Sequence, residues 1–264
     1  MYGLLGKRLG HSFSKEYFID KFAKLNLDDS YVNIELDDVC EIISFVKDNK
    51  DLKGFNVTVP YKESIISYLD DIDNIAKEVG AVNTVKVFNN GKLKGFNTDV
   101  IGFEKLLEMT CRDASMIHSI KHIDTSKTYN NNVLILGSGG ASKAVQYVLR
   151  KNNIPFKIVS RNADLGIKIS YDEINSTGFS PYSLIINTTP VGMFPNVNEY
   201  LELPYSTITS QNIFIDLIYN PAETLFLKKA RLKGAAVFNG LTMLYEQAEA
   251  AWKIWEKEQL TVNN

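Results

Sequence analysis

The stretch Val133-Leu-Ile-Leu-Gly137-Ser-Gly-Gly-Ala-Ser142 gives the clearest indication of the fold. Four apolar residues predict a buried strand, a glycine-rich turn follows, and the turn opens a predicted helix over 141–151. A strand that feeds a helix through Gly-x-Gly allows the backbone to approach a pyrophosphate, and the helix N-terminus supplies N–H donors. The pattern favours a dinucleotide site, and a tight strand-to-helix turn that binds nothing is the alternative.

The end of the next predicted strand, over 156–160, indicates which dinucleotide would bind. NAD sites usually place an acidic residue there for the ribose 2′-hydroxyl, whereas this chain has Ser160-Arg161-Asn162. An arginine can pair with a 2′-phosphate through two hydrogen bonds, so Arg161 favours NADP. The alternative for Arg161 is an ordinary solvated surface residue.

Outward from this stretch, the chain alternates short β-branched runs with amphipathic stretches, which predicts an α/β protein with mostly parallel sheets. The predicted strands cover 2–5, 31–36, 54–59, 82–88, 92–96, 133–136, 156–160, 184–187, 213–217 and 236–239. The predicted helices cover 14–25, 39–47, 61–69, 72–77, 100–109, 141–151, 222–233 and 241–257. Asn89-Asn90-Gly91 favours positive φ and predicts a hairpin. The polar stretch 110–132 is predicted to be a long connection between two domains.

Composition excludes several classes of protein. The 264 residues carry 29 Lys and Arg against 31 Asp and Glu, a net charge of −2, which argues against binding to nucleic acid or to a membrane surface. No apolar run approaches the roughly 20 residues of a membrane span, and no leader is visible. Cys40 and Cys111 are too few for a disulfide framework. We therefore expect a cytoplasmic protein. His118 and His122 lack a supporting ligand pattern, so no metal site is predicted.

Polar side chains of the first half follow the predicted strands. Asn56, Thr58 and Lys62 lie at or after the end of strand 54–59, and strand alternation could place Asn56 and Thr58 on one face. Asn83 falls at the next strand, and Asp99 follows the hairpin just before a helix. Reduction of a ketone needs a proton donor near the forming alkoxide, and a lysine oriented by a carboxylate can supply it. The alternatives are an exposed lysine and a helix N-cap aspartate.

These residues belong to a longer series of motifs. In chain order they are His11-Ser-x-Ser14, Asn56-Val-Thr-Val-Pro-x-Lys62, Gly80-Ala-Val-Asn83-Thr, Gly95-x-Asn97-Thr-Asp99-x-x-Gly102, Gly137-x-Gly-Gly-Ala-Ser142, Asn187-x-Thr-Pro-x-Gly192-Met, Asp216-x-x-Tyr219-x-Pro and Asn239-Gly-Leu-x-Met-Leu-x-x-Gln247-Ala. Together they resemble the shikimate dehydrogenase family. Because the matches run in order across nearly the whole chain, the resemblance is specific.

The resemblance implies an N-terminal substrate-binding catalytic domain over 1–109, a connection over 110–132 and a Rossmann-like NADP-binding domain over 133–239. The helix within 240–264 would pack back onto the first domain. The implied reaction is the reversible, NADPH-dependent reduction of 3-dehydroshikimate to shikimate at C3, in the pathway to chorismate and the aromatic amino acids. Lys62 would be the acid/base, paired with Asp99. The protein would be a monomer or a homodimer.

The resemblance also assigns binding residues. Ser12 and Ser14 would hold the substrate carboxylate, and the other substrate contacts would be Thr58, Asn83, Asp99, Tyr219 and Gln247. The cofactor would be bound by Gly137, Ser138, Gly139, Gly140, Ala141, Ser160, Arg161, Thr188, Leu217, Gly240 and Met243. From the residues alone, Ser14 is equally a helix N-cap, Tyr219 a packing aromatic and Gln247 a solvated neighbour of an apolar helical stripe.

The chain departs from the family pattern in three places. The family usually has Asn-Arg-Thr where this chain has Ser160-Arg161-Asn162, which weakens the prediction of NADP preference. The span from Arg161 to Asn187 is short and lacks a clear helical run, which predicts a trimmed wall on the adenine side and weaker cofactor binding. The connection 110–132 is longer than usual.

Three other functions stay open at the level of sequence. A quinate/shikimate dehydrogenase with relaxed or NAD cofactor use fits the altered neighbours of Arg161. A methylenetetrahydrofolate dehydrogenase has the same general architecture, but it does not explain Ser12 and Ser14 together with Asp99. A non-catalytic sensor of shikimate or nucleotide would keep the fold, although it has no need of Lys62 beside Asp99.

Overall fold

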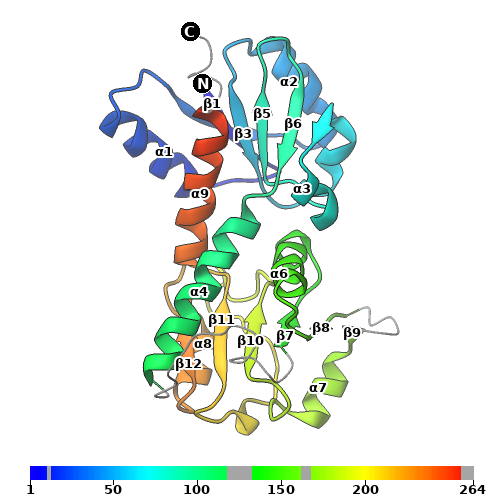
Figure 1. Cartoon of the computed structure of the whole chain (residues 1–264), viewed down its shortest axis with the longest axis vertical. Coiled ribbons are helices and arrows are strands. Elements are labelled where there is room, and N and C mark those ends of the chain that lie inside the picture. Colours follow the sequence, from blue (N-terminus) through cyan, green and yellow to red (C-terminus); the bar gives the residue numbers. More distant parts are fainter. Residues whose placement is uncertain (11–12, 118–132, 162–167, 257–264) are drawn as a thin grey trace. The chain divides into compact units, whose positions relative to one another are not determined.

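The computed structural model describes residues 1–264 except 11–12, 118–132, 162–167 and 257–264. The chain divides into two compact units (Figure 1). Unit 1 comprises Met1–Asp99 and Gln247–Asn264, and unit 2 comprises Val100–Glu246. Each unit has a six-stranded sheet with helices packed on it, which confirms the predicted α/β class.

The sheet of unit 1 is mixed. Its strands are β1 (Tyr2–Gly6), β2 (Tyr31–Glu35), β3 (Gly54–Val57), β4 (Asp71–Ile72), β5 (Thr84–Val87) and β6 (Leu93–Phe96). Its helices are α1 (Phe13–Lys24), α2 (Ile42–Asp48), α3 (Asn74–Val79), the 3₁₀ turns η1 (Val39–Glu41) and η2 (Ser64–Tyr68), and the later part of α9 (Leu241–Glu256). The strand order is β2-β1-β3-β5-β6-β4. The pairs β3–β5 and β5–β6 are antiparallel and the other pairs are parallel. The predicted hairpin is confirmed, with Gly91 at φ +81° between β5 and β6.

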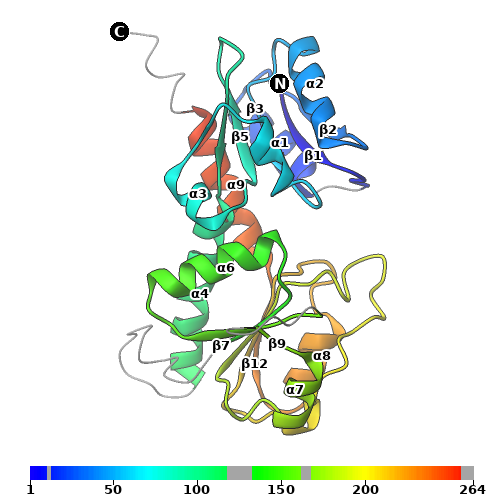
Figure 2. The same cartoon turned by 90° about the vertical axis from the view of Figure 1, so that its right-hand side faces the viewer.

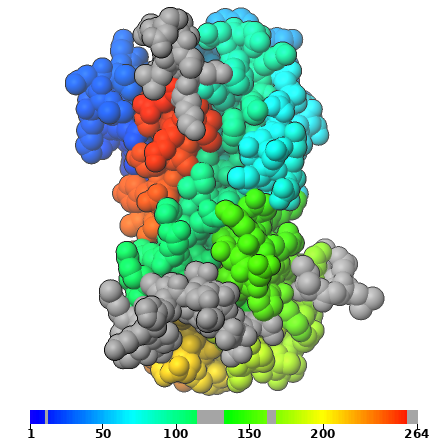
Figure 3. Space-filling model, in the orientation of Figure 1, coloured from blue at the N-terminus to red at the C-terminus, as the bar shows by residue number. Residues whose placement is uncertain are grey.

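Strand alternation divides the residues of β1 between two apolar cores. Tyr2 and Leu4 pack on one face of the sheet with Phe18 of α1 and Trp252 of α9. Leu5 packs in the cluster on the other face. Figure 3 shows the C-terminal half of α9, in red, beside α1, in blue, at the surface of unit 1. Both helices are therefore held by the same face of the sheet.

The end of α9 is fixed to the sheet by specific contacts. A Cβ at Gly54 would collide with the Trp255 indole, so the glycine lets this helix lie close to β3. Trp255 Nε1 donates a hydrogen bond of 3.0 Å to the Val85 carbonyl. Lys86 Nζ donates to the carbonyl groups of the last turn, which a helix leaves without intrahelical partners. These contacts also fix the position of Gln247, about two turns earlier in the helix.

Unit 2 contains a fully parallel sheet. Its strands are β7 (Val133–Leu136), β8 (Phe156–Val159), β9 (Lys168–Ile169), β10 (Leu184–Asn187), β11 (Ile213–Asp216) and β12 (Ala236–Phe238). Its helices are α4 (Asp99–Ile117, from Val100 on), α6 (Gly140–Lys151), α7 (Tyr171–Thr177), η3 (Tyr205–Thr207), α8 (Leu225–Arg231) and the first part of α9. Figure 2 shows α6 on one side of the sheet and α7 with α8 on the other. The strand order β12-β11-β10-β7-β8-β9 is that of doubly wound dinucleotide-binding folds.

The structure departs from the predicted elements at four places, namely α4, α7, β4 and β9. The helix expected to end at Met109 continues to Ile117, with Cys111 fully buried, so the polar connection begins later than residue 110. Helix α7 lies in the span that was expected to lack a helical run, and Ser170 caps it by accepting from the Glu173 N–H. Strands β4 and β9 were not predicted, because two residues are too few for a visible alternation.

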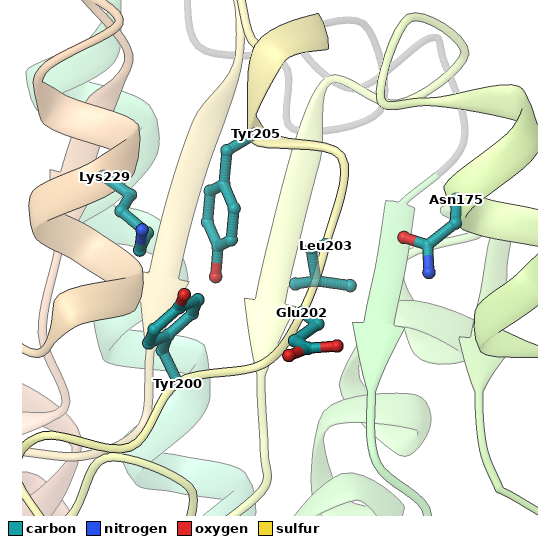
Figure 4. Close-up of a pocket in the computed structure, with 6 residues that line it drawn as sticks. All are labelled: Asn175, Tyr200, Glu202, Leu203, Tyr205 and Lys229. Atoms are coloured by element: carbon teal, nitrogen blue, oxygen red, sulfur yellow. The ribbon is translucent and has the colours of Figure 1, made fainter.

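An open hollow of about 320 Å³ lies on unit 2 (Figure 4). It is lined by Asn175, Tyr200, Glu202, Leu203, Tyr205 and Lys229. Lys229 Nζ lies 4.2 Å from the centroid of the Tyr200 ring and 5.4 Å from that of Tyr205, both within cation–π distance. The lysine of α8 thus already occupies the aromatic faces of the hollow, and it ties the segment around Tyr200 to that helix.

Candidate active site

The polar residues predicted in unit 1 gather at one edge of its sheet. Strand β3 ends at Val57, and the chain continues through a turn to Lys62. Asn83 directly precedes β5, and Asp99 begins α4 three residues after β6 ends. Antiparallel pairing brings the end of β3, the start of β5 and the end of β6 together, with Asn56 opposite Thr84. The topology therefore explains why residues far apart in sequence meet here.

Lys62 and Asp99 form a largely buried ion pair. Lys62 Nζ lies 2.6 Å from Asp99 Oδ2, and the two side chains are 16% and 7% exposed. The lysine ammonium has three protons, and the aspartate accepts only one of them. The remaining N–H groups are available to a substrate oxygen. The sequence placed these two residues on one site, and the structure brings them into direct contact.

Asn83 holds the carboxylate of Asp99 from its other side. Thr98 donates its backbone N–H to Asn83 Oδ1 at 2.7 Å, which fixes the orientation of the amide because only an oxygen can accept there. The amide nitrogen of Asn83 consequently faces Asp99 and donates to Oδ1 at 2.8 Å. Each carboxylate oxygen of Asp99 thus has a donor, and its orientation toward Lys62 is fixed.

The other predicted substrate residues have different outcomes. Gln247 of α9 reaches this cluster, with its Oε1 3.4 Å from Asn83 Nδ2. Thr58 is half-buried directly after β3, and Ser14 is half-buried in the first turn of α1. Ser12 lies outside the described residues. Tyr219 belongs to unit 2, where it follows β11.

The glycine-rich turn of unit 2 follows β7 and opens α6, as predicted. Gly137 has φ +101°, a conformation that favours glycine, and its Cα faces Thr188 and Thr189 after β10. Strands β7 and β10 are neighbours at the point where the strand order reverses, which is where this fold binds its ligands. Gly140 and Ala141 are the first residues of α6.

Gly139 tests whether this turn fits a dinucleotide. A Cβ built at Gly139 meets no atom within 4 Å, so the backbone is open to a ligand. Gly139 is also the N-cap of α6 and offers no side-chain hydrogen bond, so within the described part of the chain no cap side chain binds the first N–H groups of this 12-residue helix. An open helix N-terminus with free donors suits a pyrophosphate. The residues present therefore fit the cofactor that the sequence predicts.

The predicted cofactor residues on the neighbouring strands lie around the same edge. Ser160 and exposed Arg161 follow β8, and the Ser160 hydroxyl is 3.3 Å from that of Ser138 in the glycine turn. Thr188 donates its hydroxyl to the Leu136 carbonyl. Three further cofactor residues lie near the start of α9. A Cβ at Gly240 would collide with the Leu217 carbonyl, so the backbone at these two residues lies close together. Met243 is buried in the first turn of α9.

Sequence reasoning left several site residues unassigned. Thr98, Thr84 and Tyr31 are buried and hydrogen-bonded into the cluster of unit 1. Thr98 and Thr84 stand in the quoted motifs but were given no role, and nothing in the local sequence of Tyr31 distinguishes it from a core residue. Asp216 at the end of β11 is fully buried, and burial raises the pKa of its carboxyl from 3.8 to about 6. Its motif was visible in the sequence, but its burial was not.

Two kinds of site are not found among the described residues. No group of three or more His, Cys, Asp or Glu side chains could hold a metal ion in the part of the chain that the structure describes. Among the described helices, none combines the length and the apolar character that crossing a membrane requires.

Comparisons with known proteins agree with the geometry. Residues 4–85 match the family model described as the shikimate dehydrogenase substrate binding domain. The chain is 36% identical to a protein named shikimate dehydrogenase (NADP(+)) from Methanococcus vannielii, over 96% of this chain and 90% of the relative. A crystal structure of shikimate dehydrogenase in complex with NADP⁺ is 32% identical, with a TM-score of 0.79 over 96% of this chain and 88% of that one. The shikimate 5-dehydrogenase of Listeria monocytogenes in complex with shikimate and NAD is 27% identical, with a TM-score of 0.77 over 97% and 91%.

Proposed function

The chain belongs to the shikimate dehydrogenase family, and from that premise we propose that it interconverts 3-dehydroshikimate and shikimate reversibly, with NADP as cofactor. It is an NADP-dependent oxidoreductase of that family. The observation that carries the proposal is the buried pair of Lys62 and Asp99, with each oxygen of the carboxylate held by a donor. A lysine oriented in this way is suited to proton transfer at an oxygen atom.

Lys62 is the proton donor for the reduction. When bound, the reduced cofactor supplies a hydride to the carbonyl carbon at C3 of the substrate. As charge develops on the carbonyl oxygen, Lys62 stabilises it by hydrogen bonding and transfers a proton to it. In the oxidative direction, neutral Lys62 accepts the proton of the C3 hydroxyl.

Asp99 orients Lys62. Its Oδ2 holds the ammonium, and its lone pairs not used by Lys62 and Asn83 can accept from the neighbouring ring hydroxyl. Gln247 and Thr58 supply further polar contacts to the ring hydroxyls. Ser14, with Ser12, binds the carboxylate of the substrate.

The cofactor is held by the backbone of unit 2. The pyrophosphate would lie at the open N-terminus of α6, beside Gly139. Arg161 would pair with the 2′-phosphate, which distinguishes NADP from NAD. A second candidate is a dehydrogenase that accepts NAD, because a relative was crystallised with NAD and Arg161 lacks the neighbours usual for the family.

The experiment that tests the proposal measures nicotinamide absorbance when the full chain meets shikimate or quinate, each with NADP⁺ and with NAD⁺. We expect rapid reduction with shikimate and NADP⁺ and much slower reduction with the other three pairings. Equal rates with NAD⁺ or with quinate would assign the chain to the broader-specificity enzymes. Binding of shikimate without reduction of either cofactor would contradict the proposal and support a sensor.

A further inference from the structure

A series of buried hydrogen bonds runs across one face of the unit 1 sheet, from β2 to the Lys62–Asp99 pair. Its first link is Tyr31, which begins β2 and is 2% exposed. Tyr31 Oη donates to Asn56 Oδ1 of β3 at 2.8 Å. The Ser14 side chain of α1 interacts with the same tyrosine hydroxyl and opposes the rise in its pKa that burial causes. The series therefore begins beside a residue of the proposed carboxylate site.

Asn56 connects Tyr31 with β5 through hydrogen bonds on both sides of its amide. Because its oxygen accepts from Tyr31, its amide nitrogen must face the other way. There it donates to Thr84 Oγ1 at 3.1 Å and to the Asn83 backbone carbonyl at 3.3 Å. Asn56 is 4% exposed, so neither contact competes with bulk water.

Thr84 completes the path to the acid–base pair. Its hydroxyl lies 3.2 Å from Asn83 Oδ1 and 3.0 Å from Thr98 Oγ1, and it is fully buried. Asn83 and Thr98 are the residues that orient Asp99. A continuous set of hydrogen bonds thus connects Tyr31, with Ser14 beside its hydroxyl, to Asp99.

Stability alone does not account for this arrangement. Burying a polar side chain costs free energy that its hydrogen bonds only offset, and an apolar pair of the same shape can be as stable. Apolar residues are readily accommodated in these strands, since the neighbouring Phe55 and Val85 pack in the apolar core on the other face of the sheet. Polar residues in consecutive strands that satisfy one another do, however, specify one geometry.

We propose that Tyr31 and Asn56 are positioning residues, which fix the distance between the carboxylate site at Ser14 and the Lys62–Asp99 pair. The proposal rests on the function proposed above. A rigid substrate ring presents its carboxylate and its reacting oxygen at a fixed separation. Hydrogen bonds that hold both ends of the site at that separation favour the geometry of the transition state.

Tyr31→Phe is the variant that tests this role. It removes one oxygen and keeps the ring that stacks on Phe18, at 4.8 Å between centroids. Tyr2→Phe is the matched control. Tyr2 lies opposite Tyr31 in the β1–β2 register, belongs to the same aromatic cluster and is equally buried, yet its hydroxyl has no hydrogen-bond partner among the described residues.

Steady-state kinetics with shikimate and NADP⁺ provide the measurement. We expect Tyr31→Phe to lower kcat about 10-fold or more and to raise KM for shikimate, because a misplacement of about 1 Å has effects of this size. KM for NADP⁺ should not change, and Tyr2→Phe should stay within about twofold of wild type. A purely structural role would lower the melting temperature without this selective change in kcat and in the KM for shikimate.

Asn56→Ala provides a second test through the same path. If both residues act through one chain, the double variant with Tyr31→Phe should lose little more activity than the more impaired single variant. A Tyr31→Phe enzyme with wild-type kcat and KM, or single effects that multiply in full, would overturn the inference. A wild-type chain that does not oxidise shikimate would instead overturn the proposed function itself.

Discussion

The two units build their sites from different parts of the chain. In unit 1 the site consists of side chains, and the orientation of Asp99 depends on Lys62 and Asn83. In unit 2 the site consists largely of backbone, where Gly137 and Gly139 shape a turn at the switch point of a parallel sheet. A site of side chains can perform proton transfer, and a site of backbone N–H groups can bind phosphate whatever the neighbouring side chains are.

The two buried aspartates show the same difference. Asp99 is paired with a lysine ammonium, whereas Asp216 of unit 2 accepts from the neutral donors Thr224, Asn187 and Ile218 N–H. Burial raises the pKa of Asp216 to about 6, even though three hydrogen bonds oppose that rise. We infer that Asp99 serves chemistry and Asp216 serves the structure of the loop after β11.

Loss of the Lys62 ammonium should have the largest effect. We expect Lys62→Met to lower kcat by about two to four orders of magnitude, the scale of lost general acid–base catalysis. Lys94→Met is the matched control, because Lys94 forms an ion pair of the same 2.6 Å length with Asp71 in unit 1. Steady-state assays should show wild-type kcat for that control. Near-normal turnover of Lys62→Met would remove the lysine from the mechanism.

The next largest effect should be the pH dependence that Asp216 gives to the free energy of unfolding. Below about pH 4 its carboxyl is protonated in both folded and unfolded chains, so burial carries no ionisation cost. Between pH 4 and 6 the unfolded chain ionises and the folded chain, with a pKa of about 6, does not. This group therefore lowers the free energy of unfolding as the pH rises, by about 3 kcal/mol in full.

Asp216→Asn removes the titrating carboxyl, so the difference between this variant and wild type isolates the contribution of Asp216 to the free energy of unfolding. Urea unfolding at several pH values should show the variant gaining about 3 kcal/mol relative to wild type between pH 4 and 7, with no further change above that range. Parallel stability curves for the two proteins would show that the buried carboxyl does not titrate in this window.

A charge at the glycine turn should give a smaller but selective effect. Gly139→Asp adds a carboxylate in open space at the N-terminus of α6, where it does not collide with other atoms. The helix dipole favours that charge in the free protein, but a bound pyrophosphate is repelled by it. We expect KM for NADP⁺ to rise roughly 10- to 100-fold with an unchanged melting temperature.

Gly139→Ala separates charge from bulk at the same position. The added Cβ meets no protein atom within 4 Å but lies beside the proposed pyrophosphate, so the alanine variant should raise KM for NADP⁺ by less than the aspartate variant, which adds charge as well as bulk. Equal losses in the alanine and aspartate variants would show that close backbone approach, rather than charge, limits binding. No loss in either variant would place the pyrophosphate elsewhere.

The backbone site was easier to predict from sequence than the side-chain site. Gly137 and Gly139 sit in a local pattern, because a buried strand, a tight turn and a helix follow one another directly. Strand order and the switch point could only be assumed through the resemblance, since they depend on pairing between distant segments. Helix α7 was missed because Ile174 is its one buried residue, so its sequence shows no apolar stripe.

Only some residues of the side-chain site in unit 1 could be predicted from the sequence. Lys62, Asn83 and Asp99 were found through their motifs, and their contact distances come from the antiparallel pairing of β3, β5 and β6. Tyr31 was not identified, and Thr84 was part of a motif but was given no role. Their roles depend on hydrogen bonds across three strands, and no spacing along the chain records such contacts.

The most direct test of this division of roles is the dissociation constant of NADP⁺ for the Lys62→Met protein, measured by titration calorimetry beside the wild type. The account predicts a dissociation constant within about twofold of wild type, although turnover by the same preparation has been lost. Binding weakened as strongly as in Gly139→Asp would contradict it, because Lys62 would then be part of the cofactor site rather than the acid–base residue.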